Sequence, residues 1–374
     1  MAVADVIVVG AGIIGAACAE ACAARGLRVT VLDTAGVGGG ATAAGMGHIV
    51  VMDDSEAQFA LTCYSQALWQ RLAPELPAEA EYTPAGTIWV AADEEEMAEV
   101  RRKHAFYGAR GVATEVLDAA ALAQAEPHLR PGLAGGLRVP GDAVLYPPCA
   151  AQALLERARA RGAEVRLGVG VAAIGGGAVR LSDGGALRAG AIVNAAGAAA
   201  AALTPGLPIK PRKGHLVITE RYPGWLRHQL VELGYLKSAH SQGAESVAFN
   251  AQPRATGQIL IGSSRQFDAA DGGVDHAILA RMLRQAESYL PGLEWLAAIR
   301  AWTGFRAATP DSLPLIGRLR DDPSVVLATG HEGLGITTSL GTGALVAAAL
   351  TGEPPAIPAE PYLPERECPE AKTH

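Results

Sequence analysis

Three glycines near the amino terminus have the spacing of a dinucleotide-binding turn. Gly10, Gly12 and Gly15 form a G-x-G-x-x-G pattern directly after the apolar run at residues 6–9, and Asp33 ends the next such run. The first glycine permits a tight turn, the second lets a pyrophosphate approach the backbone, and the third lets the following helix pack on its strand. The helix amino terminus favours phosphates, and an acid about 20 residues on can bind a ribose diol. This unit predicts an adenine dinucleotide site and leaves FAD and NAD open.

A loop rich in glycine and alanine follows Asp33 at residues 36–47. Its small side chains allow the backbone to approach a flat, bulky ligand closely. The loop, with its Ala44-Gly45-Met46 stretch, resembles that of the flavoprotein family of glycine oxidase, D-amino-acid oxidases and dehydrogenases, and sarcosine oxidase. The family normally has Glu at the position of Asp33, and Asp should still reach the ribose. The resemblance therefore implies that the cofactor is FAD.

A second stretch of resemblance, at residues 302–317, contains the expected substrate-binding arginine. Relatives have a Gly-x-Arg segment before a Thr-Pro-Asp-type turn, and Arg306 matches the Arg that binds the substrate carboxylate in that family. A planar guanidinium offers two parallel donors to a carboxylate. The alternative for Arg306 is an internal ion pair with Asp311 or Asp321.

The resemblance also implies that residues 330–336 open a helix at the flavin ring. Its amino terminus would point at N1 and the C2 carbonyl, where negative charge collects on reduction. His331 could contact the flavin or could be a loop or helix-capping residue. The residues expected beside FAD, from the motif and the resemblance together, are Gly10, Gly12, Ile13, Ile14, Gly15, Asp33, Thr34, Ala41, Thr42, Ala44, Gly45, Met46, Val171, Ala196, Gly197, Arg306, Gly333, Leu334, Gly335, Ile336 and Thr337.

Three more residues are expected to bind substrate with Arg306. Asn250 aligns with a substrate-binding Tyr of the glycine oxidase pattern, so a phenol contact is lost. Tyr235, or Lys237 or His240 beside it, could replace that contact or could be an ordinary surface residue. His48 follows the flavin loop and could lie beside the isoalloxazine or form hydrogen bonds within the loop.

The activity that the resemblance implies is FAD-dependent oxidation of a small or cyclic amino acid (a D-amino acid, D-hydroxyproline, proline or a glycine-like compound). A hydride would pass from the carbon of the C–N bond to flavin N5 and give an imine, and no residue is assigned as a catalytic base. Residues 45–48 and 262–267 look closest to the flavin subunit of heteromeric bacterial D-hydroxyproline dehydrogenase. The chain could instead act mainly in electron transfer, as the flavin subunit of a multi-subunit dehydrogenase whose partners carry further redox centres. An NAD-dependent dehydrogenase is a third possibility.

The elements that must position these residues predict an α/β fold. We expect a Rossmann-like FAD-binding domain interleaved with an α+β substrate domain built on an antiparallel sheet. Alternating runs at residues 215–219 and 258–262 indicate strands of that sheet. The resemblance implies a discontinuous FAD-binding domain of residues 1–52, 140–207 and 301–365, with residues 53–139 and 208–300 in the substrate-binding domain.

Composition excludes other classes of protein. The chain has 374 residues, 49% of them hydrophobic and 18% charged, so it can bury a large core and is not disordered. A net charge of −7 without a basic block argues against nucleic acid as a partner. The 5 cysteines include no Cys-x-x-Cys pair, which favours a reducing compartment and argues against a metal or iron–sulfur site. Apolar runs are too short for a membrane helix, so we expect no transmembrane segment and a cytoplasmic location.

Overall fold

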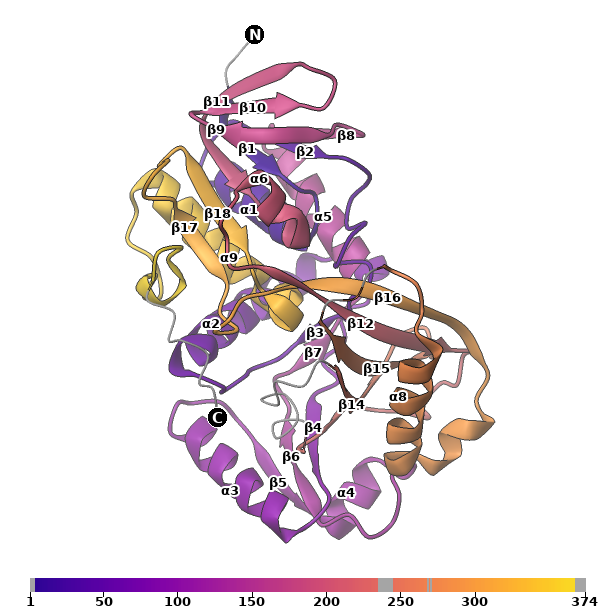
Figure 1. Cartoon of the computed structure of the whole chain (residues 1–374). Coiled ribbons are helices and arrows are strands. Elements are labelled where there is room, and N and C mark those ends of the chain that lie inside the picture. The colour runs from indigo at the N-terminus through magenta and orange to yellow at the C-terminus, as the bar shows by residue number, and fades with distance from the viewer. Residues whose placement is uncertain (1–3, 235–244, 268, 270, 367–374) are drawn as a thin grey trace.

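Two eight-stranded sheets organise the chain, one above the other in Figure 1. The structure is a computed structural model, and it describes residues 4–234, 245–267, 269 and 271–366. A third, two-stranded sheet of β3 (His48–Ile49) and β7 (Ala143–Val144) lies near the junction of the two. The α/β fold class expected from the sequence is confirmed.

The first sheet has a parallel core, and its strands run in the order β17-β18-β11-β1-β2-β8. Apolar β-branched residues fill these strands because both faces are covered: helices pack on Val6 and Val8, and the strand pair at residues 171–181 packs on Ile7. Only β17 pairs antiparallel along this path, and β9 and β10 extend the sheet beside β11. The strands are β1 (Ala4–Val9), β2 (Val29–Asp33), β8 (Glu164–Leu167), β9 (Val171–Gly175), β10 (Ala178–Leu181), β11 (Ala186–Asn194), β17 (Leu315–Arg318) and β18 (Val325–Thr329).

The second sheet is largely antiparallel, with the strand order β16-β12-β15-β14-β13-β4-β6-β5. Strand β13 pairs with β4 in parallel, and this pairing joins the strands at residues 87–139 to those at residues 210–308. Its strands are β4 (Thr87–Ala91), β5 (Glu115–Asp118), β6 (Gly135–Val139), β12 (Lys210–Thr219), β13 (Gln229–Glu232), β14 (Glu245–Pro253), β15 (Ile259–Gln266) and β16 (Ala298–Ala308).

Helices cover both sheets and begin at residues suited to cap them. Helix α2 begins after Ser55 and α3 after Asp93, and each of these side chains accepts a hydrogen bond from a backbone N–H of the first turn. Helix α8 begins after Asp275 in the same way and packs on β14 and β15. The helices are α1 (Ile13–Ala24), α2 (Glu56–Leu72), α3 (Glu94–Gly108), α4 (Ala119–Ala125), α5 (Pro147–Ala160), α6 (Ala200–Leu203), α8 (His276–Tyr289) and α9 (Gly335–Thr351).

Helix α9 is apolar and packs in the core against α1 and α2. The segment Glu332–Thr351 is long and apolar enough to cross a membrane by composition, but 61% of its apolar window is buried inside the protein. Two glycines allow the close packing: a Cβ added at Gly343 would lie 2.5 Å from the Ala17 carbonyl oxygen, and one at Gly341 would lie 2.3 Å from the Ser65 hydroxyl oxygen. Its burial is that of a core helix.

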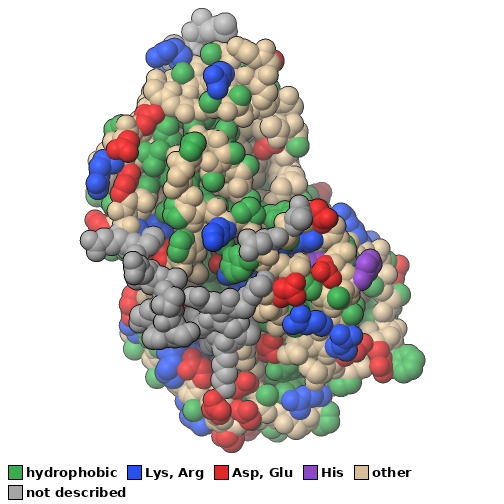
Figure 2. All heavy atoms as spheres, viewed as in Figure 1, with side chains coloured by type: hydrophobic (Ala, Val, Ile, Leu, Met, Phe, Trp, Pro, Cys, Tyr) green, Lys and Arg blue, Asp and Glu red, His purple; other side chains and the backbone are tan. Residues whose placement is uncertain are grey.

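Sheet membership bears on the expected division into domains. Strands at residues 4–9, 29–33, 164–194 and 315–329 belong to the first sheet, and those at 87–139 and 210–308 belong to the second. Strand β16 therefore crosses the boundary placed at residue 301. The domain boundaries themselves stay a prediction. Over the lower half of the molecule, basic and acidic side chains lie interspersed on the surface (Figure 2).

Candidate active site

The glycine-rich turn lies between β1 and α1, at the carboxyl end of the parallel strands. Gly10 has a φ of +111°, which L-residues with side chains rarely adopt. A Cβ added at Gly15 would lie only 1.9 Å from the carbonyl oxygen of Gly10. Asp33 holds this turn, since its carboxylate accepts a hydrogen bond of 2.7 Å from the Ala11 N–H and another of 2.8 Å from the Ala35 N–H. The sequence motif is therefore built as a close strand–turn–helix unit.

A cavity of about 280 Å³ runs from this turn to the face of the second sheet. Its walls include the loop before β3, the end of β16 and the amino terminus of α9. The residues expected from the sequence that line it are Ile13, Ile14, Ala41, Thr42, Ala44, Gly45, Met46, His48, Gly197, Asn250, Arg306, Gly333, Leu334, Gly335 and Ile336.

Other expected residues lie outside the lining. The turn itself contains Gly10, Gly12 and Gly15, and Asp33 bonds to its backbone. Thr34, next to Asp33, is exposed. Val171 and Ala196 are half-buried, at the start of β9 and just after β11.

Buried Thr337 joins α9 to β3, because its hydroxyl donates to the His48 carbonyl at 2.9 Å and accepts from the Val50 N–H at 3.3 Å. Tyr235, Lys237 and His240 lie outside the described residues.

The shape and donors of the cleft fit an adenine dinucleotide flavin. Helices α1 and α9 both begin at the cleft, and in neither does the N-cap residue supply a side-chain hydrogen bond, although the Ile13 N–H donates to the Thr42 hydroxyl at 3.0 Å. The other N–H groups of these amino termini can interact with phosphate oxygens and with the pole of a flavin ring. The loop approaches its neighbours closely: a Cβ added at Gly45 would lie 2.7 Å from the Ile336 side chain, and one at Gly304 would lie 2.3 Å from the Ala44 Cβ. These residues would hold the cofactor between the two sheets.

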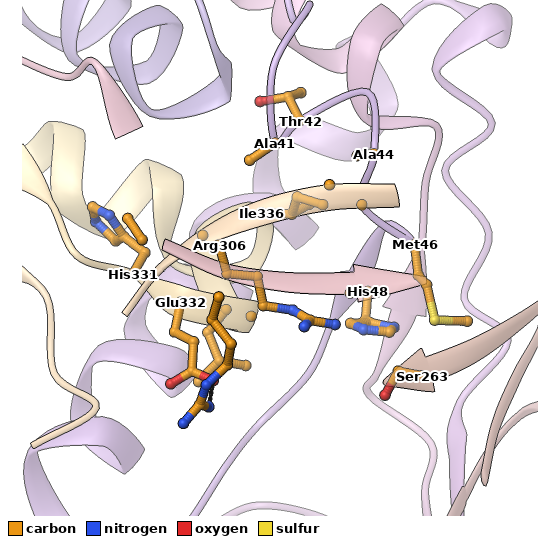
Figure 3. A pocket seen from close by; sticks show the side chains of 18 of the residues that line it. Ala41, Thr42, Ala44, Met46, His48, Ser263, Arg306, His331, Glu332 and Ile336 are labelled. Atoms are coloured by element: carbon orange, nitrogen blue, oxygen red, sulfur yellow. Dashed lines mark hydrogen bonds and ion pairs between the residues drawn. The ribbon is translucent and has the colours of Figure 1, made fainter. Parts of the chain in front are cut away.

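Arg306 projects into the cavity from β16. Its Nη1 donates a hydrogen bond of 3.0 Å to the Ser264 carbonyl on β15. Gly214 makes room for the guanidinium, since a Cβ there would lie 2.5 Å from Nη1. In Figure 3 the Arg306 guanidinium is directed toward His48. Asp311, one alternative partner considered for Arg306, forms a two-pronged ion pair with Arg366 at 2.7 and 2.8 Å.

His48 is held in one tautomer by a short chain of hydrogen bonds. Gln252 donates from Nε2 to the Met46 carbonyl at 2.7 Å, so its Oε1 faces His48 Nδ1 at 3.2 Å. Nδ1 must therefore carry the proton and donate, which leaves Nε2 as an acceptor. Burial lowers the pKa of His48 to about 4, with a smaller effect of the Arg306 charge in the same direction. The imidazole is neutral at pH 7.

Glu332 and two further arginines, which sequence analysis did not single out, also line the cavity. Arg212 forms an ion pair and a short hydrogen bond with Glu332, and Arg265 Nε lies 4.0 Å from the same carboxylate. Because Arg212 and Glu332 are 120 residues apart, no local spacing could have indicated this pair. The carboxylate offsets positive charge close to the proposed substrate site.

His331 lines the cavity but is tied to α9. Its Nε2 lies 2.9 Å from the Thr342 hydroxyl, and its side chain is buried. Burial lowers the pKa of His331 to about 3, so this imidazole is also neutral at pH 7. His331 therefore contacts α9 through Thr342 and also lines the cavity.

A family model described as FAD dependent oxidoreductase, DAO, matches residues 5–349 of the chain. The chain belongs to the DAO family. This DAO-family protein is an FAD-dependent oxidoreductase that acts on CH–NH or CH–NH2 groups of amino acids, and its cofactor is FAD. The cofactor, the enzyme class and the broad family expected from the sequence are confirmed.

Relatives with known names cover nearly the whole chain. Glycine oxidase of Geobacillus kaustophilus is 30% identical over 92% of this chain and 92% of its own, and its crystal structure has a TM-score of 0.88 over 99% and 100% of the two chains. Hydrogen cyanide synthase subunit HcnC of Pseudomonas aeruginosa is 29% identical over 98% of this chain and 97% of its own. L-proline dehydrogenase from P. horikoshii shares the fold, with a TM-score of 0.87 at 24% identity and 97% coverage of both chains.

Proposed function

We propose that this enzyme oxidises a small or cyclic amino acid at its C–N bond, with Arg306 binding the substrate carboxylate. The observation that carries the proposal is the position of the Arg306 guanidinium. It lies in the cavity shared by the flavin loop, the amino terminus of α9 and the second sheet. A planar cation at that point fixes both the position and the orientation of a carboxylate.

The residues around Arg306 favour a neutral amine on the substrate, which is the form that can be oxidised. His48 is neutral and presents an acceptor nitrogen, while the charge of Arg306 favours loss of a proton from a nearby ammonium group. Apolar side chains of Met46, Val50 and Leu216 line the same cavity and limit access of water. FAD supplies a hydride acceptor at N5, so a substrate with a neutral amine gives an imine.

The direct test is anaerobic mixing of the FAD-loaded enzyme with a panel of D- and L-amino acids, including glycine, proline and hydroxyproline isomers. We expect at least one of them to remove the visible absorption of oxidised flavin within a catalytic time. The proposal is wrong if no amino acid does so while dithionite reduces the same flavin fully. The panel also tests D-hydroxyproline, the finer substrate that the sequence resemblance favours.

A second function is supported by the name of one relative, a subunit of hydrogen cyanide synthase that matches 98% of this chain. The chain could be the flavin subunit of a multi-subunit dehydrogenase and pass electrons to partner subunits with further redox centres. Purification of a tagged chain from its native host separates the two functions. A stoichiometric partner, and a flavin that amino acids reduce only in its presence, would favour electron transfer as the main role.

A further inference from the structure

We propose that the second sheet selects substrates that carry a hydroxyl group, an inference that rests on the amino-acid oxidation proposed above. It comes from three residues that we call the polar floor: Trp89 of β4, Gln229 of β13 and Asn250 of β14. All three line the cavity that contains Arg306.

The strand register places the polar floor on one face of the sheet. Val231 pairs with both Trp89 and Asn250 across its two neighbouring strands, so these three side chains project from the same face. Gln229 lies two residues before Val231 on β13 and therefore projects from that face too. Residues of three strands thus converge on one part of the cavity wall.

Each residue of the polar floor has a buried polar atom without a hydrogen-bond partner among the described residues. These atoms are the Trp89 indole nitrogen, Gln229 Oε1 and Asn250 Oδ1. Trp89 and Gln229 are each only 2% exposed. Gln252, two residues after Asn250 on β14, instead uses both ends of its amide, on Met46 and His48. Buried polar groups in folded proteins are nearly always paired, so the polar floor has an unused capacity that a ligand can satisfy.

The types of open atom identify the chemical group. Two carboxamides and an indole N–H together offer acceptors and a donor, and a hydroxyl group both donates and accepts. An ammonium group could not accept from the indole, and an apolar group could bond to none of the three atoms. Because a carboxamide can present either its oxygen or its nitrogen, a hydroxyl group suits both orientations of Gln229 and Asn250.

The distance from Arg306 suits a short side chain or ring. The Arg306 guanidinium bonds to Ser264 on β15, and β14 with Asn250 is the next strand of the sheet. Asn250 lies opposite Gly262, two residues before Ser264, so the polar floor begins one strand across, about 4.8 Å, and two residues along the sheet from the Ser264 carbonyl. A substrate held by its carboxylate could place a β- or γ-hydroxyl on the polar floor.

The test compares pairs of substrates that differ by one hydroxyl group: serine with alanine, homoserine with 2-aminobutyrate, and 3- and 4-hydroxyproline with proline, in both enantiomers. Anaerobic flavin reduction gives kcat/KM for each. We expect the best hydroxylated substrate to exceed its partner by about tenfold or more, because an apolar analogue leaves buried polar groups unpaired. Equal or faster reduction by the apolar member of every pair would overturn the inference and leave the amino-acid oxidation intact. If no member of any pair reduces the flavin, this inference fails, and the wider amino-acid panel that includes glycine decides the proposed function separately.

Two variants test whether Gln229 and Asn250 cause the preference for hydroxylated substrates. The variants Gln229→Met and Asn250→Leu keep the size of the side chain and remove its hydrogen bonds. In each of them we expect the kcat/KM ratio of the hydroxylated to the apolar substrate of the best pair to fall toward one. This ratio is measured within one preparation, so partial unfolding does not change it. A ratio that stays at the wild-type value in both variants contradicts the role of the polar floor.

Discussion

Charge around Arg306 is set by a few side chains that come from different elements. Glu332 lies against Arg212 and Arg265, and burial keeps His48 neutral. The Glu332 carboxylate thus offsets part of the positive charge of Arg212 and Arg265, and Arg306 donates to the Ser264 carbonyl. The guanidinium of Arg306 lies in the cavity, where we propose that it meets the negative charge of the substrate.

Replacing Arg306 by Ala tests that role directly. Hydrogen bonds to charged groups contribute about 1.5–3 kcal/mol each, so we expect kcat/KM for the best amino acid to fall by about 100-fold or more. Most of the change should appear in KM, and the visible spectrum should show that FAD stays bound. Arg300→Ala is the matched control, because Arg300 is exposed on the same strand. Unchanged kinetics in Arg306→Ala would exclude carboxylate binding by this residue.

Asp142 gives a prediction on stability against pH. It is fully buried, and its Oδ1 accepts from Gln66 at 2.8 Å and from the Val51 N–H at 3.2 Å. Burial raises the pKa of this carboxyl to about 7, above the value near 3.8 expected when unfolded. The folded state therefore binds the proton more tightly, and stability falls as pH rises from about 4 to about 7.

In Asp142→Asn this part of the pH dependence should disappear. The Asn oxygen can still accept from Gln66 and Val51, and it carries no charge to bury. We expect the melting temperature of the variant to change less between pH 4 and pH 8 than that of the wild type, measured by differential scanning fluorimetry in matched buffers. Parallel curves for the two proteins would show that Asp142 does not titrate in this range.

At the scale of elements, the first sheet depends on close contact between α1 and α9. Gly343 of α9 lies directly on the Ala17 carbonyl of α1, and both helices begin at the FAD cleft. A side chain at this crossing would push the helices apart, and with them the two amino termini that face the cofactor. The glycine is required by contact between helices, since no positive φ is involved at this position.

Gly343→Ala should therefore destabilise the protein by about 1–3 kcal/mol, as overpacking of a core does, and should weaken FAD retention. Thermal unfolding and the flavin-to-protein absorbance ratio measure the two effects. Gly108→Ala is the control: this glycine ends α3, and a Cβ there would meet nothing within 4 Å. Its variant should be neutral or slightly stabilised, since Ala favours helix. Equal stability of both variants would contradict tight packing at Gly343.

At the scale of the molecule, the cleft draws on segments from both ends of the chain. The turn at residues 10–15, the loop at 41–48, β16 and the start of α9 reach it from different sheets (Figure 1). A ligand that fills this cleft adds contacts between elements that are otherwise joined by packing and by a few hydrogen bonds, such as those of Thr337. FAD should thus contribute to the stability of the whole fold.

Adding FAD to the apoprotein should raise its melting temperature by several degrees. At about 1,000 times the dissociation constant, binding to the folded state alone stabilises by about 4 kcal/mol. FMN should give a smaller shift, because it lacks the second phosphate and the adenosine, which the turn at Gly10–Gly15 and Asp33 are expected to bind. The dinucleotide assignment of that turn is contradicted if FMN and FAD give the same shift.

The amino-acid sequence by itself determined the cofactor, through its resemblance to a family, the fold class and the strand–turn–helix unit around Gly10–Gly15. Backbone geometry at Gly10 and Gly15 and the apolar patterns of strands and helices are local properties, so they can be recognised along the chain. It also indicated Arg306, through a motif of neighbouring residues. Only the tertiary structure decided which distant side chains meet. Strand register and sheet order arise from hydrogen bonds between segments far apart in sequence. They bring Arg212 to Glu332, place Gln252 beside His48, and assemble the polar floor.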